Sequence, residues 1–190
     1  MNKEIDISSV VLKTDRLLLR AWQESDLDDF YQYARVDGVG QMAGWAPHKD
    51  KEESRKILEM FINEKKTFAL AYGDKVIGSL GIEKYDQKNF PEFDDLATRE
   101  LGFVLSKEYW GQGLMSEAVK EVCRYLFEEV KLDQLVCSHF LRNIRSKRVQ
   151  EKCGFVFYKE YEYHTRMNTI ETCALTILTY EHYKELQEVE

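Results

Sequence analysis

The sequence predicts an α+β fold: a mixed, mostly antiparallel sheet with helices on both faces and a central pair of parallel strands. The strongest helical pattern, residues 115–129, lies between two strand-like segments, residues 99–106 and 133–140. A long helix that connects two strands usually makes those strands parallel. The β-rich segments on either side, residues 67–85 and 155–180, have the pattern of hairpins, so their strands should be antiparallel.

The first third of the chain predicts a strand followed by two helices. Residues 10–22 are apolar and rich in β-forming residues. Residues 24–35 predict a helix, with Ser25 as the expected N-cap and acidic residues in its first turn. A loop, residues 39–51, leads to a second helix. That helix, residues 51–66, is amphipathic, and its apolar face comprises Ile57, Leu58, Phe61 and Ile62.

The middle of the chain predicts a hairpin, a strand and the longest helix. The hairpin turns at Gly73-Asp74, and a polar, acidic connection, residues 86–98, leads to the strand. The helix of residues 115–129 has one apolar face, formed by Met115, Ala118, Val119, Val122, Leu126 and Phe127.

The last third predicts a strand, a short helix and a final strand pair. The short helix covers residues 143–153, and Gly154 can end it in a left-handed conformation. The final strands, residues 155–164 and 169–180, are joined by the tract TRMN.

Size and composition indicate a single domain, residues 1–190. The chain has 190 residues, and 44% of them are hydrophobic, which is enough for a substantial core. No apolar stretch approaches the roughly 20 residues that cross a bilayer, and the first residues lack the apolar segment of a secretory leader. We therefore expect neither membrane association nor secretion. A net charge of −7 argues against nucleic-acid binding.

The cysteines argue against a metal site. The four of them are widely spaced and form no C-x-x-C pair, so we expect no zinc. Such cysteines are typical of reduced thiols in a cytoplasm, which is the location we expect. The sequence leaves open whether the protein is a monomer or a homodimer.

Two glycines one residue apart, Gly111 and Gly113, precede the long helix. A glycine turn at a helix N-terminus can bind an anion, because free N–H groups and the helix dipole point the same way. An ordinary structural turn is the alternative. A nucleotide P-loop is excluded because no Gly-Lys-Ser/Thr follows. A dinucleotide fingerprint fits poorly, because residues 107–111 separate the turn from the preceding strand.

The segment from RELGFVLS through YWGQGLMSEAVKEV to NIRSKRVQEKCGF resembles the acetyl-CoA-binding half of the GNAT N-acetyltransferases. It is most similar to the branch that acetylates ribosomal-protein N-termini, and TDRLLLRAW, GWAP and ALTILTYEHYKEL extend the resemblance over nearly the whole chain. The family motif Q/R-x-x-G-x-G/A falls on residues 110–115. Trp110 replaces its first residue and Met115 its last. The resemblance implies that the pyrophosphate of acetyl-CoA binds at Gly111, Gln112, Gly113, Leu114, Met115 and Ser116.

The same resemblance implies that the strand RELGFVLS bulges and holds the thioester through backbone amides of Phe103, Val104 and Leu105. An amide directed at the carbonyl would stabilise the oxyanion that forms there. Leu101, Phe103 and Leu105 also alternate as a plain core stripe would. Glu100, at the start of the strand, matches a position where some family members carry a general base. An ordinary surface glutamate is the equal alternative.

The tract NIRSKRVQEKCGF carries the family's Asn-x-x-Ser pattern, with Asn143 and Ser146. The resemblance implies that Asn143 touches the pantetheine arm, and it can serve as a helix N-cap as well. Many family members protonate the leaving thiolate with a tyrosine, but Gln150 occupies that position here. Ser146 lies one helical turn earlier and resembles the serine given this role in the N-terminal acetyltransferase branch. Three basic residues of this helix are candidates for the 3′-phosphate or for a solvated face: Lys147, Arg148 and Lys152.

The resemblance implies direct transfer of an acetyl group from acetyl-CoA to a primary amine in a ternary complex. The expected acceptor is a protein or peptide N-terminus, possible alternatives being a small-molecule amine or a non-catalytic acyl-CoA-binding module. The acidic connection, with Asp86, Glu92, Asp94 and Asp95, is a candidate for attracting a basic N-terminal segment. The tract VDGVGQMAGWAPHK and the final strand pair, with Tyr161, Tyr163, His164 and Arg166, are the expected walls of the acceptor site.

Overall fold

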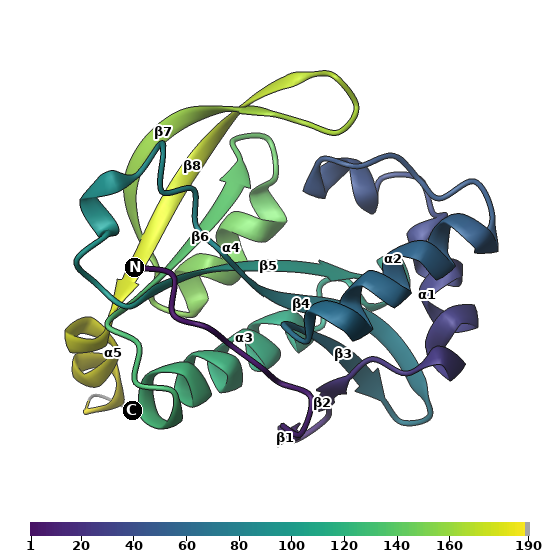
Figure 1. Ribbon diagram of the computed structural model, residues 1–190, viewed down its shortest axis with the longest axis horizontal. Coiled ribbons are helices and arrows are strands. Elements are labelled where there is room, and N and C mark those ends of the chain that lie inside the picture. Colours follow the sequence, from purple (N-terminus) through teal and green to yellow (C-terminus); the bar gives the residue numbers. More distant parts are fainter. Residues whose placement is uncertain (189–190) are drawn as a thin grey trace.

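The computed structural model describes residues 1–188 (Figure 1). An eight-stranded sheet runs through the molecule in the order β1-β2-β3-β4-β5-β6-β8-β7. Its only parallel neighbours within the described residues are β5 and β6. The strands are β1 (Leu12–Lys13), β2 (Leu18–Ala21), β3 (Thr67–Tyr72), β4 (Lys75–Glu83), β5 (Thr98–Leu105), β6 (Gln134–Phe140), β7 (Val156–His164) and β8 (Ile170–Thr179).

Helices cover both faces of this sheet, which confirms the predicted fold class. Helices α1 (Leu27–Ala34) and α2 (Lys51–Glu64) share one apolar core with β2, β3 and β4. Helix α3 (Leu114–Arg124) and its π-helical extension Tyr125–Glu129 pack on the opposite face. Helices α4 (Ile144–Lys152) and α5 (Tyr180–Gln187) contribute to that second core. The predicted connection also holds, because α3 joins the parallel strands β5 and β6.

The predicted apolar face of the long helix is buried in full. Met115, Ala118 and Val119 are at most 6% exposed, and each buried side chain of the larger kind contributes roughly 1.5–3 kcal/mol. This packing fixes the N-terminal end of α3 against the sheet, and so fixes the position of the glycine turn that precedes it.

Two local predictions are wrong, and one helix was not predicted. Residues 10–22 form two short strands, because Thr14 closes a turn: its Oγ1 accepts from the Leu17 amide at 2.9 Å. Ser25 lies inside a 3₁₀ turn, and Asp26 does the capping by accepting from the Gln23 amide at 2.8 Å. Helix α5 has no predicted counterpart, although Thr179 caps it in the ordinary way, accepting from the His182 amide at 3.2 Å.

Candidate active site

The parallel strands β5 and β6 diverge halfway along their length. Their ladder ends at the pair Leu101–Cys137, whereas β5 stays paired with β4 as far as Leu105. Strand β6 meanwhile continues along β8 to Phe140. The expected bulge in RELGFVLS is absent, because the register between β4 and β5 is unbroken. Divergence of the strands, rather than a bulge, leaves the outer side of residues 102–105 without a neighbouring strand.

A cleft of about 1260 Å³ opens at this divergence. Its lining includes the expected thioester-binding segment, Phe103, Val104 and Leu105, and most of the glycine turn. The side chain of Leu105 is nevertheless buried in the core next to α3, and Phe103 is packed against the same core. The core-stripe interpretation is thus confirmed for Phe103 and Leu105, and it leaves room for a thioester site, because the same residues also line the cleft.

The glycine turn has the backbone of an anion site. Gly111 has a φ of 78° and Gly113 a φ of 79°, a region that other residues rarely adopt. Gly113 is the N-cap of α3, and without a side chain it provides no cap. The first helical hydrogen bond runs from Glu117 N to Gly113 O at 3.0 Å. The amide groups of residues 114–116 therefore have no carbonyl partner within the helix.

The neighbours of the turn hold it in place. The Arg16 guanidinium donates to the Gln112 carbonyl at 3.0 Å and pairs with Glu117 at 2.7 Å. The side chains of Leu114 and Met115 are buried in the core. Met115, which departs from the family motif, therefore leaves its amide at the turn without crowding it.

Trp110, the other departure from the motif, closes the turn from the side. Its indole Nε1 donates to the Leu105 carbonyl at 2.8 Å, and the Arg145 guanidinium lies 4.6 Å from its ring. Arg145 lines the cleft together with Arg148 and Lys152, so this end of the cleft is basic. Lys147, the third predicted basic residue, lies outside it and faces Glu151 at 3.8 Å. Arg145 was not predicted from the sequence, because its contact with a tryptophan 35 positions away leaves no local signal.

Glu100 lies in the cleft beside the end of the parallel ladder. The pKa of its carboxyl is raised to about 7, chiefly by burial and to a smaller extent by the charges of Glu83 and Asp86. The Ser138 hydroxyl from β6 donates to Glu100 Oε1 at 2.9 Å, which opposes this shift. Tyr161 from β7 in turn donates to Ser138 Oγ at 3.0 Å. The carboxyl is thus poised to exchange a proton near neutral pH.

Asn143 caps α4 and ties it to the loop after α1. Its Oδ1 accepts from the Ser146 amide at 3.2 Å, and its Nδ2 donates to the Met42 carbonyl at 3.2 Å. Ser146 lines the cleft one turn into the helix.

Gln150, which replaces the expected tyrosine, is buried beneath Ser146. Its Nε2 donates to the Ser138 carbonyl at 3.2 Å and to Ser146 Oγ at 3.1 Å. Because a carbonyl can only accept, the amide orientation of Gln150 is fixed. Ser146 therefore accepts from Gln150 and keeps its own proton free to donate elsewhere.

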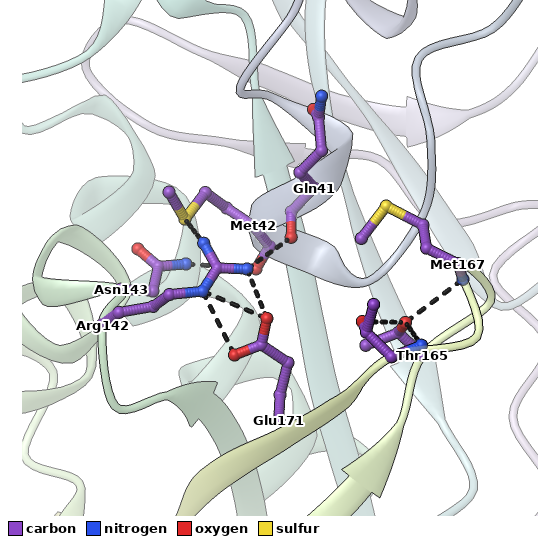
Figure 2. A network of polar contacts seen from close by, with 8 residues as sticks. Gln41, Met42, Arg142, Asn143, Thr165, Met167 and Glu171 are labelled. Atoms are coloured by element: carbon purple, nitrogen blue, oxygen red, sulfur yellow. Dashed lines mark hydrogen bonds and ion pairs between the residues drawn. The ribbon is translucent and has the colours of Figure 1, made fainter.

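The two expected acceptor walls, the loop after α1 and the β7–β8 hairpin, are connected through Arg142 (Figure 2). Arg142 donates to the Gln41 carbonyl at 3.4 Å and pairs with Glu171 of β8 at 2.7 Å. The Arg166 amide donates to the Gly44 carbonyl at 2.9 Å. The loop after α1 is thereby joined to the β7–β8 hairpin, and the residues of that hairpin that line the cleft include Tyr161, Tyr163, His164 and Arg166.

The acidic side chains of residues 86–98 mostly bind partners outside the cleft. Asp86 lines the cleft, but Glu92 pairs with Lys159 at 2.7 Å and Asp94 accepts from Tyr85 at 2.6 Å. Within residues 1–188, no group of three His, Cys, Asp or Glu side chains is placed to hold a metal ion. In that same part of the chain no helix has the length and apolarity needed to cross a membrane.

Comparison with known proteins assigns a class to this architecture. The model of the acetyltransferase (GNAT) domain family matches residues 16–156. The probable N-acetyltransferase YjcK of Bacillus subtilis is 43% identical over 135 residues, which are 70% of this chain and 70% of that protein. These matches show that the chain is an acetyltransferase. It belongs to the GNAT family and transfers an acetyl group from acetyl-CoA to a nitrogen atom.

Solved structures share the fold at lower identity. An acetyltransferase of the GNAT family from Bacillus anthracis is 22% identical with a TM-score of 0.79, covering 90% of this chain and 99% of that one. A ribosomal-protein alanine acetyltransferase of Vibrio fischeri is 21% identical with a TM-score of 0.70, covering 92% of this chain and 98% of that one. At such identities the likeness concerns the fold alone.

Proposed function

We propose that this enzyme acetylates the N-terminal α-amine of a peptide or protein, by direct attack of the amine on acetyl-CoA in a ternary complex. The observation that carries the proposal is Glu100, a carboxyl with a pKa raised to about 7 at the point where the cleft divides β5 from β6. The acceptor class follows from the sequence resemblance to N-terminal acetyltransferases and from the pKa of Glu100. Four free, buried cysteines agree with a cytoplasmic enzyme.

The coenzyme fits the basic end of the cleft. The pyrophosphate binds the turn of Gly111, Gln112 and Gly113 and the free amides of Leu114, Met115 and Ser116, because uncapped N–H groups at a helix N-terminus favour an anion. Arg145, Arg148 and Lys152 add positive charge for the phosphates. The unpaired side of Phe103, Val104 and Leu105 holds the thioester through the backbone. Asn143 borders the pantetheine arm and keeps α4 attached to the loop after α1.

The reaction then needs one proton acceptor and one donor. As the amine nitrogen bonds to the acetyl carbon, its proton passes to the Glu100 carboxylate. As the carbon–sulfur bond breaks, the Ser146 hydroxyl donates a hydrogen bond to the leaving thiolate. Because a thiol has a pKa of about 8.5, close to neutral pH, one hydrogen bond is enough to stabilise the leaving thiolate.

A covalent acetyl-cysteine intermediate is disfavoured by the thiols themselves. Burial raises the pKa of each of them, to about 12 for Cys153 and about 11 for Cys173, and well above the ordinary value for Cys123 and Cys137. Since the thiolate is the nucleophilic form, none of these cysteines is activated for attack.

The pKa of Glu100 favours an α-amine over a lysine side chain. An α-ammonium of pKa about 7.7–8.0 lies within about one unit of the carboxyl, whereas lysine, near 10.4, lies more than three units above it. The difference of about 2.5 units between the two acceptors corresponds to roughly 3.4 kcal/mol.

The test uses one peptide that has a free N-terminus and an internal lysine, and the same peptide with its N-terminus blocked. Thiol release gives the rate, and mass spectrometry locates the acetyl group. We expect acetylation of the free N-terminus and almost none of the blocked peptide. Acetylation mainly on lysine in both peptides would refute the α-amine preference. Activity with small amines but with neither peptide would replace the proposal with a small-molecule acetyltransferase.

A further inference from the structure

Glu83 stands beside the proposed base, Glu100, in the cleft. The two residues are directly opposite each other in the antiparallel pair of β4 and β5, so their side chains lie on the same face of the sheet. Both line the cleft. The Glu83 carboxylate lies over Gly81, where its Oε1 is 2.6 Å from the position of a Cβ built on that glycine. A side chain at position 81 would displace the carboxylate, so this glycine sets where the charge lies.

The charges around Glu83 do not balance. Lys66 pairs with Glu83 Oε2 at 2.6 Å and with Glu64 at 2.9 Å, so one positive charge is shared by two carboxylates. The group of three therefore has a net charge of about −1. The Glu83 side chain is 40% exposed, so a further partner can reach it. This negative charge contrasts with the basic end of the cleft, where the coenzyme fits.

A buried hydroxyl next to the Glu83 carboxylate lacks a hydrogen-bond partner. Thr67 of β3 lines the cleft and is only 3% exposed. Its Oγ1 lies 3.5 Å from the same Cβ position at Gly81 that Glu83 Oε1 approaches. Within residues 1–188 this oxygen has no partner, and because buried polar groups nearly always have one, it points to a ligand. A carboxylate oxygen and a hydroxyl oxygen around one point suit a cation with several N–H donors.

The cation that fits here is distinct from the amine that reacts. A carboxylate stabilises the ammonium form of an amine, which cannot attack a thioester, so the reacting nitrogen does not benefit from binding at Glu83. Gly81 lies one strand from Gly102 of β5, and Thr67 lies one strand further. With strands about 4.8 Å apart, a cation there is roughly 5–10 Å from an amine above Gly102. A cationic side chain close to the acceptor's N-terminus can span this distance, and so can the second nitrogen of a diamine.

We propose that Glu83 Oε1 and Thr67 Oγ1 form a subsite for a second positive charge on the acceptor. This inference rests on the proposed function and deepens it, because it names the acceptor class: an amine that carries a further cation. On a peptide, that cation is an arginine or lysine side chain at the second residue. It would bring the group of Glu64, Lys66 and Glu83 to neutrality. By offsetting the charge of Glu83, it would also leave more of Glu100 ionised and able to accept a proton.

The experiment measures kcat/KM for two pairs of acceptors whose members differ by one positive charge. The peptides carry arginine or citrulline at the second residue, since citrulline has the shape of arginine without its charge. The small amines are 1,4-diaminobutane and butylamine. Each acceptor is assayed with the wild type, with Glu83→Gln, and with Glu53→Gln as the matched control. Glu53 is a carboxylate of α2 that also lines the cleft.

We expect the wild type to prefer the arginine peptide about threefold to tenfold, and less so at high salt. Glu83→Gln should abolish this preference, and Glu53→Gln should keep it. Thr67→Val, which has the same shape without the hydroxyl, should reduce the preference, and Thr67→Ser should restore it. Each preference is a ratio measured with one enzyme, so a change that slows both acceptors equally cancels.

Two results would overturn the subsite and leave the proposed function intact. One is acetylation of both peptides at equal rates by the wild type. The other is a preference for arginine that persists in Glu83→Gln, which would place the second charge elsewhere. If only the small amines react and the diamine is preferred through Glu83, the subsite stands while the peptide acceptor falls. If only the small amines react and neither is preferred, the subsite and the peptide acceptor fall together.

Discussion

Replacing Ser138 should change the pH dependence of this enzyme, because its side chain contacts the proposed base, Glu100. Its hydroxyl donates to Glu100 Oε1 at 2.9 Å and stabilises the ionised carboxyl against the burial that favours the neutral form. Replacing Ser138 with alanine removes that donor and leaves the backbone of β6 in place. The remaining influences on Glu100, burial first and then the charges of Glu83 and Asp86, all raise its pKa.

The size of the shift follows from the hydrogen bond that is lost. A hydrogen bond to a charged group contributes roughly 1.5–3 kcal/mol, and each pKa unit corresponds to about 1.36 kcal/mol. Ser138→Ala should therefore raise the pKa of Glu100 by about one to two units above its value of about 7. Since the base acts as a carboxylate, activity should appear at higher pH. At about pH 7 the rate should fall roughly fivefold to fiftyfold, and it should recover as the pH rises.

The assay is kcat/KM for one acceptor, measured by thiol release from about pH 5.5 to 9.5 with wild type and variant. Their ratio cancels the titration of the acceptor amine, which is the same for both enzymes. Tyr161→Phe is the matched control, because it removes the hydrogen bond to Ser138 but not the one to Glu100. It should shift the profile less. A Ser138→Ala enzyme that is slow by one constant factor at every pH, or whose profile moves to lower pH, would refute the role of Glu100 as the base.

Three further variants test other parts of the site. Gly113→Val should weaken acetyl-CoA binding about tenfold or more in calorimetry, because a side chain is strained at a φ of 79° and the turn loses its amide geometry. Gly73→Val is the control, at a φ of 59° in a hairpin turn away from the cleft. It should lose stability but bind acetyl-CoA with normal affinity. Ser146→Ala should lower kcat severalfold while leaving acetyl-CoA affinity unchanged, since Gln150 holds that hydroxyl as a donor; full activity would mean that the thiolate leaves unaided. At about pH 8, Glu100→Gln should have a higher melting temperature than the wild type. The pKa of the folded Glu100 carboxyl is raised to about 7, so the wild type loses stability as the pH rises from about 4.5 to about 7. At about pH 4 the two proteins should have similar melting temperatures.

The sequence sufficed where the signal is local. The apolar period of residues 115–129 and the glycines before them are short-range patterns, and they predicted α3, its parallel flanking strands and the turn at Gly113. The network of Glu100, Ser138 and Tyr161 was beyond such reasoning, because it joins three strands whose register no local pattern records.

Other features depend on contacts that only the folded chain makes. β5 follows β4 as far as Leu105 while β6 follows β8 as far as Phe140, so the divergence of β5 from β6 depends on the pairing of four strands, and no residue of RELGFVLS indicates it. Gln150 was visible in the sequence only as a missing tyrosine. Its role as a fixed donor to Ser146 depends on a carbonyl of β6, which the amide of Gln150 meets only in the tertiary structure.

The placement of the tryptophans equips this protein with its own optical probes. Of its three tryptophans, Trp22 is buried and does not line the cleft, Trp110 borders the glycine turn, and Trp45 lines the cleft from the loop that is the expected acceptor wall. Indole emission responds to charge and to solvent near the ring, and Trp110 already has the Arg145 guanidinium 4.6 Å away. In two variants, Trp22 is kept together with either Trp110 or Trp45 alone. The Trp110 variant would report binding of the coenzyme, and the Trp45 variant binding of the acceptor, as separate fluorescence changes. Rapid mixing with such variants would then reveal the order in which the two substrates enter, without any label.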